Sequence, residues 1–422
     1  MAREIGFGNY KFDAQIWAIW IAAVIGSFGF GIVFPFLAIY LSQTIGLSEM
    51  LIGVVMMSYM AIGTFFMIFG GAWADKFGRK KIMVISLVGE GGLLCMYTFA
   101  SEFWGFLAIA LAEGAIGSLY PPAANAMVAD LVPSDKRPEC YSLIRIAYNL
   151  GSAIGPMIGS FLLLSMSLQH MFLIAGLAVG AMAILIATRT SETLSVKKGE
   201  EFQYKDMRLA VKDRAFMLFC VLVAMTFFLY AQTLSAMPVY SNQELGIQMS
   251  LYGLVFATNA GMVVLLQIPV TAHAVRFRRT TALSFGQGLM ALGMVILFLI
   301  KDFGGLILAM VVFTLGELYH AAVYSTVVAD LAPRRLRGTY MGVSGVAIGI
   351  GDSVGMFVGM ALLGALLMPA FLWLIMAGIG MASMIGYLAL RKLISEEIDT
   401  GTLELAIAEA VVAEAPVIIV KK

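Results

Sequence analysis

Apolar stretches long enough to cross a membrane recur along the whole chain, separated by short charged or turn-forming segments. A spanning helix needs about 20 mostly apolar residues, and about twelve stretches meet that requirement. Their approximate limits are 15–41, 51–74, 81–100, 103–128, 141–164, 168–188, 215–238, 251–275, 281–300, 304–329, 339–364 and 369–391. The first stretch is too long and too rich in glycine for a cleaved signal peptide. The pattern therefore predicts an all-α membrane protein with twelve spanning helices.

Basic residues fall almost entirely on one side of these spans. An even number of spans places both termini on one side, which carries Arg3 and Lys11, then Lys421 and Lys422, and the basic residues of the connections between them. The opposite side carries only Lys301. Because basic residues accumulate in cytoplasmic connections, we expect a multi-pass protein of the cell membrane with both termini in the cytoplasm.

The composition excludes a soluble protein. Apolar residues make up 61% of the chain and charged residues 13%, with a mean hydropathy of +0.92, whereas a globular chain has about 45–50% and 25%. A net charge of +1 gives no basis for nucleic-acid binding, which needs a basic face. The three cysteines, Cys95, Cys140 and Cys220, are too far apart for a disulfide framework or a metal-binding spacing.

One sizeable polar connection divides the spans into two sets of about six. It predicts an N-terminal bundle (1–188), a cytoplasmic linker (189–214), a C-terminal bundle (215–392) and a tail (393–422). The mixed charges of the linker favour a surface helix near Lys205–Arg214. The tail after Ile394 is too acidic to span the membrane, and we expect a loose amphipathic helix or disorder there, with no assigned function.

The two halves repeat in sequence. Residues 128–137 (VADLVPSDKR) match 328–337 (VADLAPRRLR), and one residue earlier in register 117–120 (GSLY) match 316–319 (GELY). The first register continues through the glycine pairs Gly151/Gly351, Gly155/Gly355 and Gly159/Gly359. Two six-helix halves that enter from the same side are related by an axis along the membrane normal. This parallel repeat is typical of transporters whose binding site lies near the midplane, between the halves.

The connection after the second span reads GGAWADKFGRKK from 70 to 81. Gly78 permits a tight turn, and Asp75 can face the positive N-terminal end of a neighbouring helix. The segment resembles the cytoplasmic signature of the major facilitator superfamily. That resemblance implies a conformational latch, in which Asp75 docks on a helix of the other half and Arg79 pairs with Asp130. The second-half counterpart, 274–279 (AVRFRR), keeps the basic residues but lacks the aspartate.

The fifth span carries Gly151, Gly155, Pro156 and Gly159. Glycines four apart form a smooth face for close packing, and a proline removes a backbone hydrogen bond and kinks the helix. The pattern resembles the motif of the drug:proton antiporter branch; an ordinary kinked packing face is the alternative. That branch usually carries a buried arginine in the fourth span, where this chain reads ALAEG at 110–114. The arginine's role is therefore not carried over, although Arg145 in the fifth span could partly replace it.

Ionisable residues inside spans are costly and are functional candidates. Glu317 lies in the tenth span within 313–320 (FTLGELYH), which resembles a Leu-Gly-Glu segment of bacterial multidrug exporters in this branch. Glu113 lies in the fourth span, and Asp352 in the eleventh. Removal from water disfavours the charged form of a carboxyl group, which suits a residue that takes up and releases a proton. These three acids are the proton-coupling candidates; the alternative for each is a hydrogen-bonded interior acid.

The resemblance implies that the first, fourth, seventh and tenth spans line a central cavity. The expected substrate-contacting residues are mostly aromatic or apolar: Phe28, Phe34, Tyr120, Met225, Tyr230, Tyr319, Tyr324, Arg145 and His320. Arg145 lies about one turn inside the fifth span, where it could instead snorkel to the interface, pair with an acid or attract an anion. His320 could relay protons or be an ordinary hydrogen-bonded residue. Glu90, on the expected peripheral third span, is interpreted as structural.

These observations together predict the major facilitator fold and proton-coupled export of amphipathic or hydrophobic compounds by rocker-type alternating access. We expect a monomer that contacts membrane lipids and its small-molecule substrate, uses protons as the coupling ion and needs no cofactor or metal. The alternatives are a symporter or uniporter of a small anionic metabolite, an amphipathic-lipid flippase, and a membrane receptor or scaffold. No GxxxxGK[ST], HExxH or GxSxG motif stands in a suitable context, which argues against an ATP-driven pump and against an enzyme.

Overall fold

The computed structural model describes residues 4–7, 10–133, 136–194, 209–333 and 336–402. These residues form helices, apart from an antiparallel hairpin of β1 (Glu4–Phe7) and β2 (Tyr10–Asp13), in which Glu4 pairs with Asp13. The helices are α1 (Ala14–Gln43), α2 (Glu49–Phe77), α3 (Arg79–Tyr97), α4 (Phe103–Gly117), α5 (Tyr120–Leu131), α6 (Arg137–Leu162), α7 (Leu168–Arg189), α9 (Arg214–Leu234), α10 (Ala236–Gln243), α11 (Met249–Ala274), α12 (Arg279–Leu299), α13 (Phe303–Leu331), α14 (Arg337–Ala365), α15 (Phe371–Leu390) and α16 (Glu396–Thr400).

The helix limits lie close to the predicted spans. The predicted span 251–275 corresponds to Met249–Ala274, and 168–188 corresponds to Leu168–Arg189. Two spans are interrupted: the fourth consists of α4 and α5, and the seventh of α9 and α10. Ten of the described helical segments are long and apolar enough to cross a membrane by composition alone. The ten do not include α3 and α6, whose first turns are charged.

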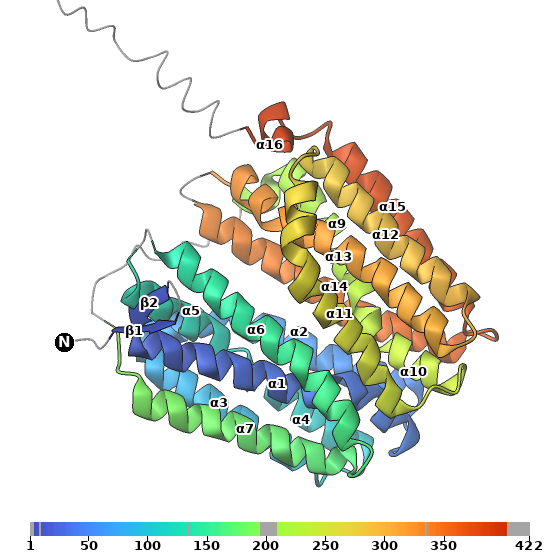
Figure 1. Cartoon of the computed structure of the whole chain (residues 1–422), viewed down its shortest axis with the longest axis horizontal. Coiled ribbons are helices and arrows are strands. Elements are labelled where there is room, and N and C mark those ends of the chain that lie inside the picture. Colours follow the sequence, from blue (N-terminus) through green and yellow to red (C-terminus); the bar gives the residue numbers. More distant parts are fainter. Residues whose placement is uncertain (1–3, 8–9, 134–135, 195–208, 334–335, 403–422) are drawn as a thin grey trace, which may run out of the picture.

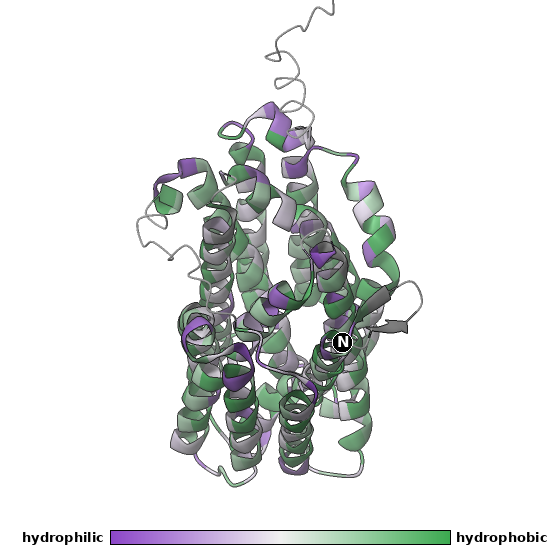
Figure 2. Ribbon diagram, turned by 90° about the vertical axis from the view of Figure 1, so that its left-hand side faces the viewer, coloured by the Kyte–Doolittle hydropathy of each residue, from purple (hydrophilic) through white to green (hydrophobic). Residues whose placement is uncertain are grey.

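Two helical bundles lie side by side (Figure 1). Helices α1–α7 form the first half, and α9–α15 form the second half. This confirms the expected all-α architecture of two six-helix bundles. We call the end at which α1 begins and α15 ends the terminal face, and the end around Gln43 and Asn242 the opposite face. Figure 2 shows hydrophobic residues along the helices and hydrophilic residues mainly in the connections and helix ends.

The two halves are joined at the opposite face. Gln43 is hydrogen-bonded to Asn242, and the Gln243 amide donates to Ser42 Oγ at 2.9 Å and to Glu49 Oε1 at 3.2 Å. At the terminal face, every ion pair among the described residues stays within one half. Hydrogen bonds therefore join the halves at the opposite face, whereas the ion pairs of the described residues at the terminal face do not.

Glycine faces bring specific helices into backbone contact. A Cβ atom placed on Gly155 of α6 would lie 2.8 Å from Gly31 Cα of α1, and one placed on Gly159 would lie 2.8 Å from Phe36. The repeat reproduces this packing in the second half, where a Cβ on Gly355 of α14 would lie 2.7 Å from the Phe228 carbonyl of α9. The sequence repeat is thus also a repeat of helix pairs.

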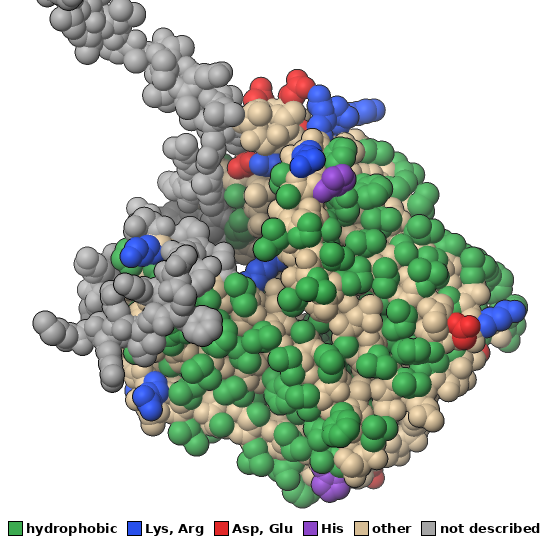
Figure 3. Space-filling model, in the orientation of Figure 1, with side chains coloured by type: hydrophobic (Ala, Val, Ile, Leu, Met, Phe, Trp, Pro, Cys, Tyr) green, Lys and Arg blue, Asp and Glu red, His purple; other side chains and the backbone are tan. Residues whose placement is uncertain are grey.

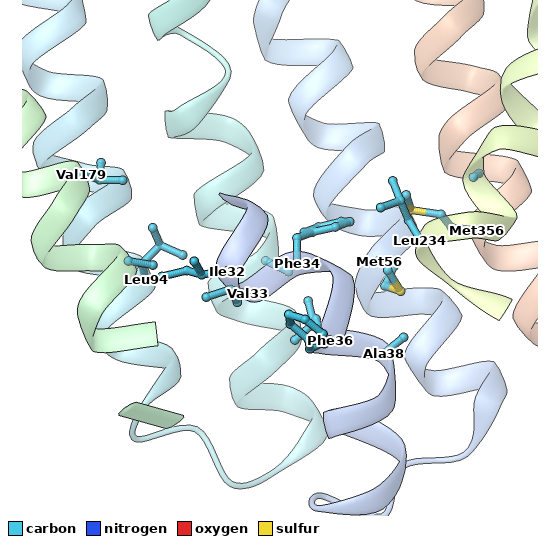
Figure 4. Packing of buried hydrophobic residues seen from close by; sticks show 14 of the residues in the cluster. Ile32, Val33, Phe34, Phe36, Ala38, Met56, Leu94, Val179, Leu234 and Met356 are labelled. Atoms are coloured by element: carbon cyan, nitrogen blue, oxygen red, sulfur yellow. The ribbon is translucent and has the colours of Figure 1, made fainter. Parts of the chain in front are cut away.

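Apolar side chains fill the space between the helices. In Figure 4, Phe34 and Met56 lie on the part of the first half that approaches Leu234 and Met356 of the second half. On the outside, apolar side chains cover most of the visible face, and charged side chains gather mainly at its ends (Figure 3). This distribution matches a protein surrounded by lipid along its middle.

Part of the acidic tail is folded. α16 packs on α12 and α13, and its Asp399 is 1% exposed. The Asp399 carboxylate accepts hydrogen bonds from the Thr280 backbone N–H at 2.9 Å and from Thr280 Oγ1 at 2.8 Å. The acidic tail therefore begins with a docked helical turn, and residues 403–422 lie outside the described part. Of the surface helix expected near Lys205–Arg214, residues 209–212 are helical, and residues 205–208 lie outside the described part.

The α1–α6 contact predicts that Gly155→Ala destabilises the protein by about 1–3 kcal/mol, because the added methyl group enters a space that backbone atoms already occupy. Gly180→Ala is the matched control, since a Cβ atom there meets nothing within 4 Å. Thermal unfolding of the purified variants in detergent measures the difference. Equal melting temperatures for both variants would contradict the packing argument.

Candidate functional site

A cavity of about 390 Å³ lies among the helices of the first half. Its described lining residues come from α1–α7 and include no lysine, arginine or histidine. Its aromatic and methionine residues are Phe30, Tyr59, Tyr120, Tyr148, Met60, Met67 and Met182. Phe30 is 41% exposed and Met67 38% exposed, so the cavity is open to its surroundings. We call this space the first-half cavity.

The only carboxylate among the described lining residues of this cavity is Glu90 of α3. A smaller space of about 30 Å³ adjoins it, and Glu90 and Glu113 both line this space, together with Tyr59 and Tyr97. The Glu113 side chain is 8% exposed and lies near Tyr97, which lines the same space. The third and fourth spans therefore each place one acid beside the same small space.

The break in the fourth span explains how the cavity reaches Glu90. α4 ends at Gly117, and α5 begins at Tyr120, immediately before Pro121 and Pro122. A proline has no N–H to donate to the carbonyl four residues earlier, so the helical bonds to the Gly117 and Ser118 carbonyls cannot form. Gly117 also leaves room for Glu90, because a Cβ there would lie 3.3 Å from Glu90 Cδ.

The predicted cavity residues of the first half lie in different surroundings. Tyr120 lines the first-half cavity, is 5% exposed, and its hydroxyl has no hydrogen-bond partner among the described residues. Phe34 lines the smaller space, with its ring centroid 4.4 Å from that of Phe30 and 5.6 Å from that of Tyr59. Phe28 is half-buried and packs against the apolar core.

Glu317 is half-buried on α13 and faces α11. Its Oε2 accepts a hydrogen bond from Asn259 Nδ2 at 2.8 Å, and the same amide lies 2.9 Å from Thr314 Oγ1. Tyr230 of α9 lies within electrostatic range of both Glu317 and Asp352. Three spans of the second half therefore meet around these two carboxyl groups.

Asp352 lies on a helix that contacts both halves. This helix, α14, packs on α9 of its own half and on α2 of the other. Its side chain is 8% exposed, and its Oδ1 has no hydrogen-bond partner among the described residues. One turn earlier, a Cβ atom on Gly349 would collide with the Thr64 side chain of α2. A change in the charge of Asp352 would thus act on a tightly packed interface.

The remaining predicted residues of the second half do not converge on one cavity. His320 is 5% exposed and lies 3.2 Å from the Tyr387 hydroxyl, which is 3.2 Å from Thr226 Oγ1 inside the bundle. The Tyr319 hydroxyl lies 2.6 Å from His273 Nδ1, in an outer pocket between α11, α12 and α13. Tyr324 donates to Ser344 Oγ at 2.9 Å, and Met225 packs half-buried against the second-half core.

Arg145 is exposed on α6. It precedes Tyr148 and Ser152, which line the first-half cavity, by three and seven residues. This spacing places all three on one helical face. Arg145 itself does not belong to the described lining of that cavity, and no described acid pairs with it.

The residues of the predicted latch gather at the terminal face. Arg79 contacts Asp75, and Arg79 Nε lies 3.2 Å from Asp130 Oδ2. Gly78, between α2 and α3, has φ +109°, and a side chain there would meet the Glu192 carboxylate. Glu192 Oε1 accepts a hydrogen bond from the Arg79 backbone N–H at 2.8 Å. In this conformation Asp75 thus pairs inside its own half, with its side chain 65% exposed.

The sequence pattern did not predict that three polar residues lie at the candidate sites. Glu90 was interpreted as structural, yet it lines both spaces of the first half. Glycines 89, 91 and 92 flank it, and such small neighbours were a signal that another helix approaches closely. Asn259 and Glu192, the partners of Glu317 and Arg79, gave no comparable signal. Among the described residues, no group of three or more His, Cys, Asp or Glu side chains could hold a metal ion.

Comparison with known proteins agrees with this architecture. The family model described as Major Facilitator Superfamily matches residues 19–356 and 234–408. A Na(+), Li(+), K(+)/H(+) antiporter of Planococcus maritimus is 29% identical over 359 residues, 77% of this chain and 84% of that protein. The multidrug resistance protein MdtH of Yersinia enterocolitica is 28% identical over 370 residues, 85% of this chain and 90% of that protein.

A solved structure is similar across nearly the whole chain. A POT family transporter, crystallised with a thioalcohol-conjugated peptide, superposes with a TM-score of 0.78. The match covers 92% of this chain and 98% of that one, at 14% sequence identity. This likeness concerns the fold.

The latch geometry predicts that Asp75→Asn slows transport turnover while substrate affinity changes by no more than a few-fold. An exposed ion pair contributes little to stability, so a loss of turnover would reveal a contact that forms in another conformation. Transport rates and binding to the purified variant are the measurements, with Glu102→Gln, an exposed acid at the opposite face, as the control. Wild-type turnover in Asp75→Asn would contradict the latch.

Proposed function

The chain belongs to the major facilitator superfamily, and on that premise we propose that it exports amphipathic or hydrophobic compounds in exchange for protons. Membership makes it a multi-pass secondary transporter of a small-molecule substrate rather than an enzyme. The drug export and the proton exchange are our proposals. The names of the two relatives, a multidrug resistance protein and a cation/proton antiporter, support them.

The observation that carries the proposal is the character of the first-half cavity. Aromatic rings and methionine side chains form a large, adaptable apolar surface, and about 390 Å³ suits a small organic compound. A carboxylate with no basic neighbour in the lining favours neutral or cationic compounds over anionic ones. This supports export of amphipathic compounds more than transport of an anionic metabolite.

Coupling requires a group whose charge differs between the two access states. Arginine does not deprotonate in proteins, so the candidates are the acids inside the spans. We assign the principal role to Glu317, because it lies in the middle of α13 and is only half-buried beside the Asn259 amide. Glu113 and Asp352 are the secondary candidates. Burial of the neutral Glu317 carboxyl group costs little free energy, whereas the ionised carboxylate attracts a cationic substrate.

Alternating access fits the contacts between the halves. Hydrogen bonds join them at the opposite face, whereas the latch residues at the terminal face pair inside the first half. When the opposite face opens and the terminal face closes, the hydrogen bonds between the halves at the opposite face would break. Contacts between the halves would then form at the terminal face. In this scheme Asp75 leaves Arg79 and docks on the second half when the terminal face closes.

Each of three rival functions has a distinct test. An anion symporter or uniporter would depend on the exposed Arg145, so Arg145→Gln would abolish transport. A flippase would move a fluorescent amphipathic lipid between leaflets of a vesicle. A receptor or scaffold would move no compound at all, and the buried Asp352 on a helix that contacts both halves argues against a static role.

Glu317→Gln is expected to retain the fold and some substrate binding but to abolish transport driven by a pH gradient, because glutamine cannot exchange a proton. Glu113→Gln should give a milder loss. Reconstituted vesicles with an imposed pH gradient and a fluorescent organic cation provide the measurement.

Glu244→Gln, an exposed acid at the opposite face, is the matched control and should transport normally. Wild-type transport by Glu317→Gln, together with loss in Glu113→Gln or Asp352→Asn, would place the proton site elsewhere and contradict the assignment.

We also propose that the terminal face is cytoplasmic, that the protein resides in the cell membrane and that it works as a monomer. Lys301→Cys should then react with an impermeant thiol reagent added outside intact cells, and Ser191→Cys should not. Both substitutions belong in a background without Cys95, Cys140 and Cys220. The reverse labelling pattern would overturn the orientation.

A further inference from the structure

Several oxygen atoms near Glu90 lack a full set of hydrogen-bond or charge partners. Glu90 and Glu113 line the same space of about 30 Å³, which is large enough for a water molecule or a small ion. Among the residues that the structure describes, no lysine, arginine or histidine lines this space or the adjoining first-half cavity. Two carboxyl groups in such a place cannot both be ionised without a cation to balance them.

The interrupted fourth span adds neutral oxygen ligands. Pro121 and Pro122 deprive the Gly117 and Ser118 carbonyls of helical partners, and both residues line the first-half cavity. Ser86 Oγ donates to the Ile116 carbonyl at 2.6 Å and lies 3.3 Å from the Gly117 carbonyl, so this helix end is only partly satisfied. Unwound carbonyls and the carboxyl ends of half-helices are the groups that coordinate small cations in transporters with broken helices.

Tyr120 is an independent indication of a missing ligand. Its side chain is 5% exposed, its hydroxyl has no hydrogen-bond partner in the described part of the chain, and it lines the first-half cavity within electrostatic range of Glu90. A buried hydroxyl without a partner costs free energy. An ion beside Glu90 would supply that partner, because a hydroxyl oxygen is also a ligand for hard cations.

The repeat shows that this arrangement is specific to the first half. Tyr120 corresponds to Tyr319, and the two prolines correspond to His320 and Ala321, so α13 continues without a break. The Tyr319 hydroxyl has His273 as a partner. The second half therefore lacks the interrupted helix and the unpartnered tyrosine that surround Glu90.

We propose that the space around Glu90, between Glu113 and the broken end of α4, binds one alkali metal cation. Glu90 lines both spaces, with Glu113 beside it in the smaller one and with Gly117, Ser118 and Tyr120 beside it in the first-half cavity. The polar ligands that these residues offer on either side of Glu90 are oxygen atoms, which suit hard cations. A single positive charge leaves the two carboxylates with no more than one net negative charge. The site is separate from Glu317 and goes beyond the proposed exchange of compounds for protons.

The test uses the full chain purified in detergent, without any transported compound. Its melting temperature is measured in increasing LiCl, NaCl or KCl, with N-methyl-D-glucamine chloride maintaining constant ionic strength. At least one alkali ion should raise the melting temperature in a saturable manner. Glu90→Gln should abolish this shift, Glu113→Gln should weaken apparent affinity about tenfold, and Glu102→Gln should leave it unchanged.

Tyr120→Phe provides a second measurement if Glu90→Gln fails to fold, because it removes one oxygen and keeps the ring. The concentration of the stabilising alkali ion that gives half of the melting-temperature shift should rise several-fold in this variant relative to the wild type. Identical melting temperatures in all four salts, or unchanged binding in the folded variants, would mean that the acids hold protons only and would overturn the proposal. Neither result depends on whether Glu317→Gln transports.

Discussion

Close backbone packing between glycine-lined helices is the constraint on which this structure depends. In lipid no hydrophobic force drives one apolar helix toward another, so dispersion contacts between closely packed backbones have to hold the helices together. Gly155 lets α6 approach Gly31 of α1, and Gly355 lets α14 approach Phe228 of α9. Because these pairs are equivalent in the repeat, the same kind of backbone contact holds each half together.

The same packing explains why a few polar residues can affect the contacts between helices. A bundle held by backbone contact leaves limited space inside, and the carboxyl groups in that space meet neighbours that are fixed in position. Asp352 lies on α14, which meets α2 and α9, and one of its oxygens has no hydrogen-bond partner among the described residues. Protonation there, or at Glu317 beside Asn259, would change the interactions at a contact between helices. This placement supports the proposed coupling between proton binding and movement of the halves.

The two halves share an architecture but differ in chemistry. In the first half, two prolines interrupt the fourth span, and a cavity with Glu90 lies beside the break. In the second half, α13 is continuous, and His320, Tyr387 and Thr226 form a buried polar chain inside the bundle. A substrate cavity biased toward the first half and a proton site in the second would separate the two ligands, so that movement of the halves links them.

The sequence by itself determined the spans, the two equivalent halves and the family, because apolar length, basic-residue asymmetry and short motifs are local properties of the chain. It also singled out Glu317, Glu113 and Asp352, since any acid inside a span is conspicuous. Tertiary structure alone decided which neighbour each side chain meets. Glu90 reaches the cavity from a span expected to be peripheral, and Tyr319 lies in an outer pocket beside His273 instead of the expected cavity. The rotation of a helix about its axis is set by contacts with its neighbours, and in a helix that is apolar on every side the sequence carries little record of that rotation.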